Sequence, residues 1–202
     1  MALTVFETAT TSTAEQLAEC LQALTETRQL NGERVSVSAC SPGPISDAEL
    51  LFRAFDQPVH FQNGEIVPTA FDDAKIRGMS VNRRSYITVD DALRLAFSRV
   101  AMVNHSKAQH ASALGRQPTA EKRRMVAYTV FKTSDIRLLL HGQEPESVRR
   151  VFGVYDTATE ADSSHGDVFF LLPGKQKQAW RSARSRLYDL AKNGLIILGN
   201  PA

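Results

Sequence analysis

The sequence predicts an α+β protein of one domain, in which helices pack on a mixed β-sheet. Stretches with the 3.6-residue period of a helix and stretches with the alternation of a strand both occur along the chain. They do not alternate strictly, as they would in a parallel α/β fold. With 43% hydrophobic and 23% charged residues, the 202-residue chain has an ordinary globular composition and is long enough to bury a core.

Residues 1–42 are expected to form a small acidic, βαβ-like unit within that domain. Strands are predicted at 3–6 and at 34–40, where Val and Ser alternate. A helix is predicted at 13–30, because leucines recur at helical spacing after a Ser-x-x-Glu capping box. The breaker sequence SPGPIS then leads into the main body, residues 47–202.

The middle of the chain is expected to supply two strands, a helix and a long loop. A helical turn leads into a strand over 47–55, and Gly78 opens another strand over 78–86. Thr88 caps a helix that runs to about residue 105. The polar, aperiodic residues 105–124 predict a long mobile loop that can include a short helical piece. The apolar stripe of the helix comprises Leu93, Ala96, Phe97, Val100 and Val103.

The last third of the chain is rich in strands and ends in a basic helix. Strands are predicted at 125–131, 149–157 and 165–173, where β-branched and aromatic residues gather. Pro173 and Gly174 turn the chain into the basic helix, and a short strand follows at 195–198.

Cysteine usage and hydropathy indicate a cytoplasmic protein. No run of about 18 apolar residues occurs, so no membrane span is expected. The N-terminus lacks the basic start and apolar stretch of a signal peptide. Cys20 and Cys40 are too far apart for a CxxC site, and no cluster has metal-finger spacing, so free thiols and no metal are expected. A disulfide between them would require a different compartment. No motif indicates a cofactor.

Charge is distributed unevenly along the chain. Residues 1–74 hold 3 basic and 11 acidic side chains, whereas residues 75–202 hold 21 basic and 11 acidic ones. The two parts therefore carry net charges of −8 and +10. Such asymmetry indicates an anionic partner such as nucleic acid, a protein partner, or two parts of one domain that neutralise each other.

The first candidate site is the strand that follows Gly78. Alternation places Ser80, Asn82 and Arg84 on one face and Arg83 on the other. A guanidinium beside a hydroxyl and an amide suits a phosphate or carboxylate ligand. The alternative is an edge strand whose charges prevent pairing with other chains.

The second candidate site is the loop before the strand at 165–173. Asp156, Asp162, His165 and Asp167 lie within twelve positions. A histidine beside a carboxylate is held in one tautomer and acts as a general acid or base. The alternative is a polar hairpin in which Asp and Ser form turns.

Basic residues of the second half form a third candidate, a nucleic-acid surface. Helical spacing brings Lys177, Trp180, Arg181 and Arg184 together, so that the cations contact phosphates while the indole stacks on a base. Arg123 and Arg124 are assigned to the same surface. The alternative is that Trp180 belongs to a core stripe at helical spacing, which then comprises Trp180, Ala183, Leu187 and Leu190.

Three segments together resemble a group of small uncharacterised bacterial proteins. These segments are LFRAF…GEIVPTAF, GMSVNRR and VYDTATEADSSHGDV, which span roughly residues 50–170. The resemblance implies sites and no particular reaction. The residues that carry it are Arg53, Phe71, Ser80, Val81, Arg83, Asp156 and His165.

The leading hypothesis from the sequence is one polar pocket for an anionic group, such as the phosphate of a nucleotide or nucleic acid. His165, oriented by Asp156 or Asp167, would transfer protons in phosphodiester or nucleotidyl chemistry. The alternative is a non-catalytic assembly or partner-binding protein. The expected ligand-binding residues are Arg53, Ser80, Asn82 and Arg83.

Overall fold

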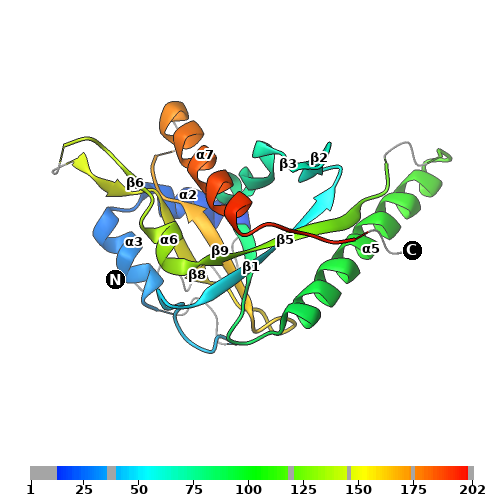
Figure 1. The fold of residues 1–202 in the computed structure, drawn as a ribbon, viewed down its shortest axis with the longest axis horizontal. Helices are drawn as coiled ribbons and strands as arrows, with labels where there is room; N and C mark the ends of the chain where they lie inside the picture. The colour runs from blue at the N-terminus through cyan, green and yellow to red at the C-terminus, as the bar shows by residue number, and fades with distance from the viewer. Residues whose placement is uncertain (1–12, 36–39, 118–120, 145–146, 174–175, 200–202) are drawn as a thin grey trace.

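The centre of the molecule is a six-stranded β-sheet with the strand order β10-β5-β1-β4-β9-β8 (Figure 1). The computed structural model describes residues 13–35, 40–117, 121–144, 147–173 and 176–199. Every described pairing in the sheet is antiparallel, so the α+β class is confirmed, whereas the expected mixed sheet is antiparallel instead. The strands are β1 (Leu50–Gln57), β4 (Met79–Arg83), β5 (Arg124–Lys132), β8 (Phe152–Asp156), β9 (His165–Phe170) and β10 (Ile196–Ile197).

Two short hairpins and three short helices connect these strands. Asn63 and Gly64 both have positive φ, as the tight turn of an Asn-Gly hairpin requires. The predicted strand at 149–157 is interrupted at Val151, and its first part pairs outside the main sheet. The hairpins are β2 (Phe61–Gln62) with β3 (Glu65–Ile66) and β6 (Leu140–His141) with β7 (Arg149–Arg150); the short helices are η1 (Pro68–Phe71), α4 (Asp73–Ile76) and α6 (Thr133–Arg137).

The predicted N-terminal helix is two helices, α2 (Ala14–Ala23) and α3 (Glu26–Glu33). The capping box is formed by Thr13 and Gln16, one position later than the expected Ser12 and Glu15. Leu24 has an extended backbone, which ends α2 and lets Thr25 begin α3. The predicted strand at 3–6, and most of that at 34–40, lie outside the described residues.

The helix that Thr88 caps is longer than predicted. The Thr88 side chain accepts a hydrogen bond from the backbone of Asp91, and α5 then runs over Val89–Ala113. The loop expected at 105–124 is therefore wrong for 105–113, which are rich in helix-forming residues and contain neither Gly nor Pro. The helix ends just before Gly115, whose φ of 65° is the left-handed conformation common after a helix C-terminus.

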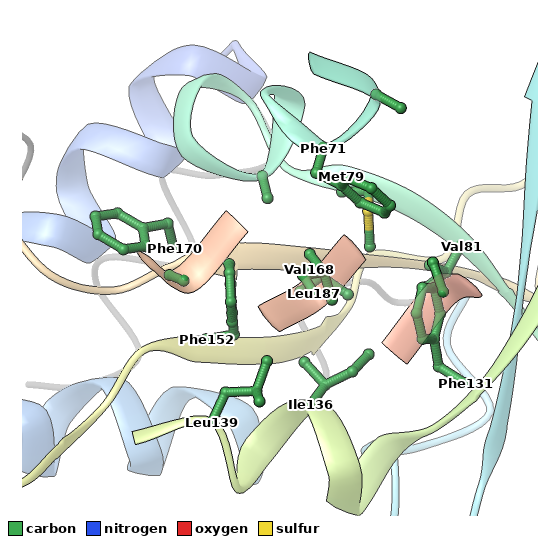
Figure 2. Close-up of a cluster of buried hydrophobic side chains, with 14 of the residues drawn as sticks. Phe71, Met79, Val81, Phe131, Ile136, Leu139, Phe152, Val168, Phe170 and Leu187 are labelled. Carbon is green, nitrogen blue, oxygen red and sulfur yellow. The ribbon is translucent and has the colours of Figure 1, made fainter. Parts of the chain in front are cut away.

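The main core lies on one face of the sheet, beneath α6 and α7 (Lys177–Asn193); we call this face the α7 face. Figure 2 shows Phe152, Val168 and Phe170 from the sheet packed with Leu187 of α7. Trp180 is also in this core, with its ring centroid 5.1 Å from that of Phe170, so the core alternative for Trp180 is confirmed.

The opposite face of the sheet, which we call the α2 face, is covered at its two ends. Phe169 and Leu171, which alternate with core residues of β9, pack against Leu17 and Leu21 of α2. Helix α5 contacts β1 and β5 at the other end of the sheet. Between these helices the α2 face carries polar side chains, and the candidate site lies there.

Candidate functional site

Arg83 lies on the α7 face and is 1% exposed. All five of its N–H groups are bonded within the chain. Nε and Nη2 donate to the Glu49 carboxylate at 2.8 and 2.7 Å, and Nη1 donates to Asp156 at 3.2 Å. The remaining bonds go to the carbonyl oxygens of Gly43 and Pro44.

This ionic cluster is built as a closed unit. A buried charge must be paired and hydrogen-bonded, and Arg83 meets both conditions. Burial by itself would raise the pKa of Glu49, but its hydrogen bonds to Arg83 hold that pKa below its usual value. Asp156 also contacts the Ser41 hydroxyl and accepts from the backbone of Ala158. A ligand anion at Arg83 would have to displace one of these partners, so the ligand role of Arg83 stays a prediction.

The sheet divides the predicted site residues into two groups. Ser80 pairs with Asp167 and Asn82 pairs with His165 across β4 and β9. Directly paired residues share a face, and successive residues alternate, so these four side chains lie on the α2 face. Arg83 follows Asn82 in the chain and therefore lies on the opposite face from His165. The structure does not place Arg83 and Asp156 beside His165.

His165 is oriented by Thr157 and Asp167. Its Nδ1 lies 3.0 Å from the Thr157 hydroxyl oxygen and 3.2 Å from the Thr157 carbonyl oxygen. The Thr157 hydroxyl donates its own hydrogen to Asp167 at 2.7 Å. Both Thr157 oxygens are then acceptors toward Nδ1, which therefore carries the hydrogen. Of the two predicted orienting carboxylates, the structure places Asp167 next to this histidine.

Asn82 belongs to a network that connects β4 with α5. Its amide donates to Asp162 and to the Ser164 hydroxyl, both at 2.9 Å. Arg99 of α5 donates to the same Asp162 carboxylate at 2.8 Å. This network fixes one end of the Arg99 guanidinium beside the α2 face.

Arg53 fills the space where β1 and β4 separate. The two strands pair only at Leu51–Arg83 and Phe52–Asn82. Beyond these pairs the Arg53 side chain donates to the carbonyl oxygens of Ser80 at 2.9 Å and Ala70 at 3.3 Å. The side chain is 7% exposed, and its Nε has no hydrogen-bond partner among the described residues. Burial lowers the pKa of Arg53 from its usual value.

Three arginines meet at a cavity of about 160 Å³, which we call the arginine cavity. It lies between β1, the start of β5 and the first half of α5. The described residues that line it are Arg53, Ala54, Asp56, His60, Ala96, Arg99, Val100, Val103, Arg123 and Met125.

Arg123 is held in the cavity wall through its backbone. The Asn104 side chain accepts from the Arg123 N–H and donates to the Arg123 carbonyl, both at 2.9 Å. The Arg123 guanidinium donates to Asp56 at 3.2 Å, while its Nε is buried without a partner among the described residues. Asn104 thus fixes the entry to β5 against α5.

Asp56 and His60 form a pair at the end of β1. The His60 N–H donates to the Asp56 carbonyl at 2.8 Å, and His60 Nδ1 contacts the Asp56 carboxylate. The Asp56 N–H lies 3.4 Å from Nδ1, but the closer carboxylate is the stronger partner and places the hydrogen on Nδ1. Burial would raise the pKa of Asp56, but the bond to His60 and the charge of Arg123 hold it below its usual value.

The Asp56–His60 pair is absent from the site predicted by the sequence. Its only signal is a histidine four residues after an aspartate, at the point where a predicted strand meets Pro58. Such a spacing is common in turns and indicates no particular chemistry without the arginines that the fold brings beside it.

The predicted nucleic-acid residues are spread over two regions. Arg123 lines the arginine cavity, and Arg124 beside it donates to Gln57 at 3.4 Å. Lys177 and Arg181 are exposed on α7, and Arg184 donates to Asp72 at 2.8 Å. Because α7 covers the α7 face, its cations do not join Arg123 in one site.

The chain was compared with known proteins. No family model matches it, and neither the curated proteins nor the solved structures contain a match. The resemblance to small bacterial proteins therefore stays a prediction. Within the described residues, no three or more His, Cys, Asp or Glu side chains are grouped as a metal site would require. None of the described helices combines the length and apolar character needed to span a membrane.

Proposed function

We propose that this chain binds the phosphate of a nucleotide or nucleic acid in the arginine cavity. The observation that carries the proposal is that Arg53, Arg99 and Arg123 line one cavity, where the Nε–H groups of Arg53 and Arg123 are buried without partners among the described residues. A buried donor left unpaired destabilises a protein by about 1–3 kcal/mol, and more when the group is charged. A ligand that accepts from these donors removes that penalty.

The charges lining the cavity favour an anion. Arg53, Arg99 and Arg123 contribute three positive charges, while Asp56 supplies the only carboxylate among the described lining residues. Guanidinium groups present planar pairs of donors that match phosphate oxygens. Arg53 and Arg123 are the residues predicted from the sequence to bind a ligand or nucleic acid that line this cavity, and the bond from Arg53 to the Ser80 carbonyl places β4 beside it.

The volume of the cavity indicates how much of the ligand enters. Pockets for whole small molecules are commonly about 300–1,000 Å³, so a cavity of about 160 Å³ admits a phosphate group with part of a sugar. The rest of the ligand would lie on the surface outside. Exposed basic residues continue there from the entry to β5, namely Arg116, Lys122 and Arg124.

Binding of a fluorescein-labelled single-stranded DNA, followed by fluorescence anisotropy, tests the proposal. Arg99→Gln and Arg123→Gln should each weaken binding at least tenfold, because each removes a cavity cation. Arg94→Gln is the matched control, since Arg94 is on the same helix as Arg99, has a 78% exposed side chain and lies outside the cavity lining. Thermal melting followed by circular dichroism would establish that the variants are folded.

The salt dependence provides a second criterion. Binding should weaken as the salt concentration rises, because each phosphate contact releases counterions. The slope of log affinity against log salt concentration should be smaller in magnitude in Arg99→Gln and Arg123→Gln. To include a nucleotide as ligand, ADP binding is measured directly by isothermal titration calorimetry. Absence of any binding by the DNA and by ADP at low salt, or equal affinity of the folded cavity variants and the native chain, would refute the proposal.

An assembly role is the second candidate, favoured by apolar side chains that α5 exposes. Phe97 and Met102 on α5, and Leu114 directly after it, are 46%, 68% and 54% exposed. Exposed large apolar side chains along one element are typical of protein contacts. Size-exclusion chromatography with light scattering, comparing the native chain with Met102→Gln, tests this candidate. A monomer at all concentrations would refute self-assembly through α5.

A further inference from the structure

We infer that the arginine cavity cleaves a ribose phosphodiester, with His60 as the base that takes the proton of the 2′-hydroxyl. This inference rests on the proposed phosphate binding and adds a substrate class and a reaction. Its evidence is the Asp56–His60 pair, which lies among the three arginines.

Three contacts fix His60, one through its backbone and two through its ring. Its backbone N–H bonds to the Asp56 carbonyl, its Nδ1 contacts the Asp56 carboxylate, and its ring packs edge-on against Phe55 at a centroid distance of 6.4 Å. Asp56 is itself held by Arg123. A neutral imidazole with its hydrogen on Nδ1 has its lone pair on Nε2, so Nε2 is the atom that can accept a proton.

The lining of the cavity indicates where the nucleophile comes from. Among its described residues there is no Ser, Thr, Tyr, Cys or Lys, so none supplies a hydroxyl, thiol or amine that could attack phosphorus. The one carboxylate, Asp56, has one oxygen beside His60 and the other beside Arg123. RNA carries its own nucleophile, because the 2′-hydroxyl is next to the phosphate that the arginines would hold.

The reaction is a transesterification that needs no other reactant. His60 Nε2 takes the 2′-hydroxyl proton while the 2′ oxygen forms a bond to phosphorus. The bond between phosphorus and the 5′ oxygen breaks, and that oxygen takes a proton from solvent. His60 then returns its proton to solvent, which leaves a 2′,3′-cyclic phosphate and a 5′-hydroxyl.

The neighbouring charges assist each stage of this step. Negative charge grows on the phosphate oxygens as the 2′ oxygen attacks, and fixed guanidinium groups stabilise it without reorganisation. The Asp56 carboxylate stabilises the imidazolium that forms on His60. The same contact keeps the ring in the tautomer that exposes the basic nitrogen.

The test uses a DNA strand that contains a single ribonucleotide, and the same strand made entirely of deoxynucleotides. The native chain should cleave only the first strand, at the ribonucleotide, and mass spectrometry should show the cyclic phosphate. His60→Asn keeps an N–H donor near the Nδ1 position for Asp56 but lacks Nε2. It should lose cleavage by about 100-fold or more, as loss of a general base does, while binding changes less than threefold.

His105→Asn is the control, because His105 is exposed on α5 and lies outside the cavity lining. This variant should cleave like the native chain, which also excludes a contaminating nuclease. Binding of the strand through Arg99 and Arg123 without cleavage would overturn the inference and leave the proposed function standing. Equal cleavage by His60→Asn, or cleavage of the all-DNA strand, would also overturn it. Failure to bind either strand, together with failure to bind ADP, would remove the proposed function itself.

Discussion

Arg83 and His165 lie on opposite faces of the same sheet, although their strands are direct neighbours. His165 pairs with Asn82, the residue that precedes Arg83 in β4. One position along a strand reverses the direction of the side chain. The sheet therefore separates a buried ionic cluster around Arg83 from a polar face that leads toward the arginine cavity. Stability and ligand binding can be tested separately because of this separation.

Replacing Arg83 by Met should destabilise the protein by about 3–5 kcal/mol, because Glu49 and Asp156 would lose the charge that pairs them in the interior. Urea denaturation followed by circular dichroism measures this difference. Arg94→Met, which breaks an exposed pair with Asp91, should change stability by less than about 1 kcal/mol. Equal effects of the two substitutions would contradict a structural role for Arg83.

The contribution of Glu49 should depend on pH. Its pKa is lowered in the folded state, so its stabilisation is fully present above the unfolded value of about 4.3 and is lost as the pH falls through the lower folded value. The difference in urea midpoint between the native chain and Glu49→Gln should therefore be largest near neutral pH and shrink in acid. A difference that grows as the pH falls would be inconsistent with this linkage. Glu65→Gln, which changes an exposed side chain of the β2–β3 hairpin, controls for removal of a charge.

Asn104→Ala should weaken phosphate binding without removing a cavity charge. The substitution removes both hydrogen bonds that hold the Arg123 backbone, and we expect a loss of about 1–3 kcal/mol in stability. Affinity for labelled DNA should fall several-fold, because Arg123 is no longer fixed at the cavity. His105→Ala, at the next position on α5, should leave both quantities unchanged. Native affinity in Asn104→Ala would show that this clamp does not position Arg123 for binding.

Two glycines with similar backbones should respond differently to alanine. Gly78 and Gly64 have φ of 88° and 83°, so alanine is strained at both, by about 1–2 kcal/mol. At Gly78 the new Cβ would also lie 2.7 Å from the Phe169 ring, whereas at Gly64 it meets nothing within 4 Å. Gly78→Ala should therefore be the more destabilising by about 1–3 kcal/mol, the usual effect of overpacking. Equal urea midpoints for the two variants would mean that Phe169 moves aside freely.

The sequence by itself determined features that depend on neighbours along the chain. Thr88 caps α5 because its side chain reaches an amide three residues away. Trp180, Ala183 and Leu187 share one face of α7 because they follow its 3.6-residue period. Gly78 has the left-handed backbone that its lack of a side chain permits. Each of these interactions is completed within a few residues, so a local pattern predicts it.

Only the tertiary structure decided how the site residues are grouped. Arg53, Arg99 and Arg123 come from β1, α5 and the position just before β5, and the pairing of strands brings them to one cavity. Arg83 turns toward Glu49 and Asp156 because the register of β4 with β1 and β9 places it on the core face. Register depends on the total apolar surface buried by segments far apart in the sequence. A short sequence pattern does not report this total buried area. Only the fold therefore determines which face each polar side chain lies on and which partner it has.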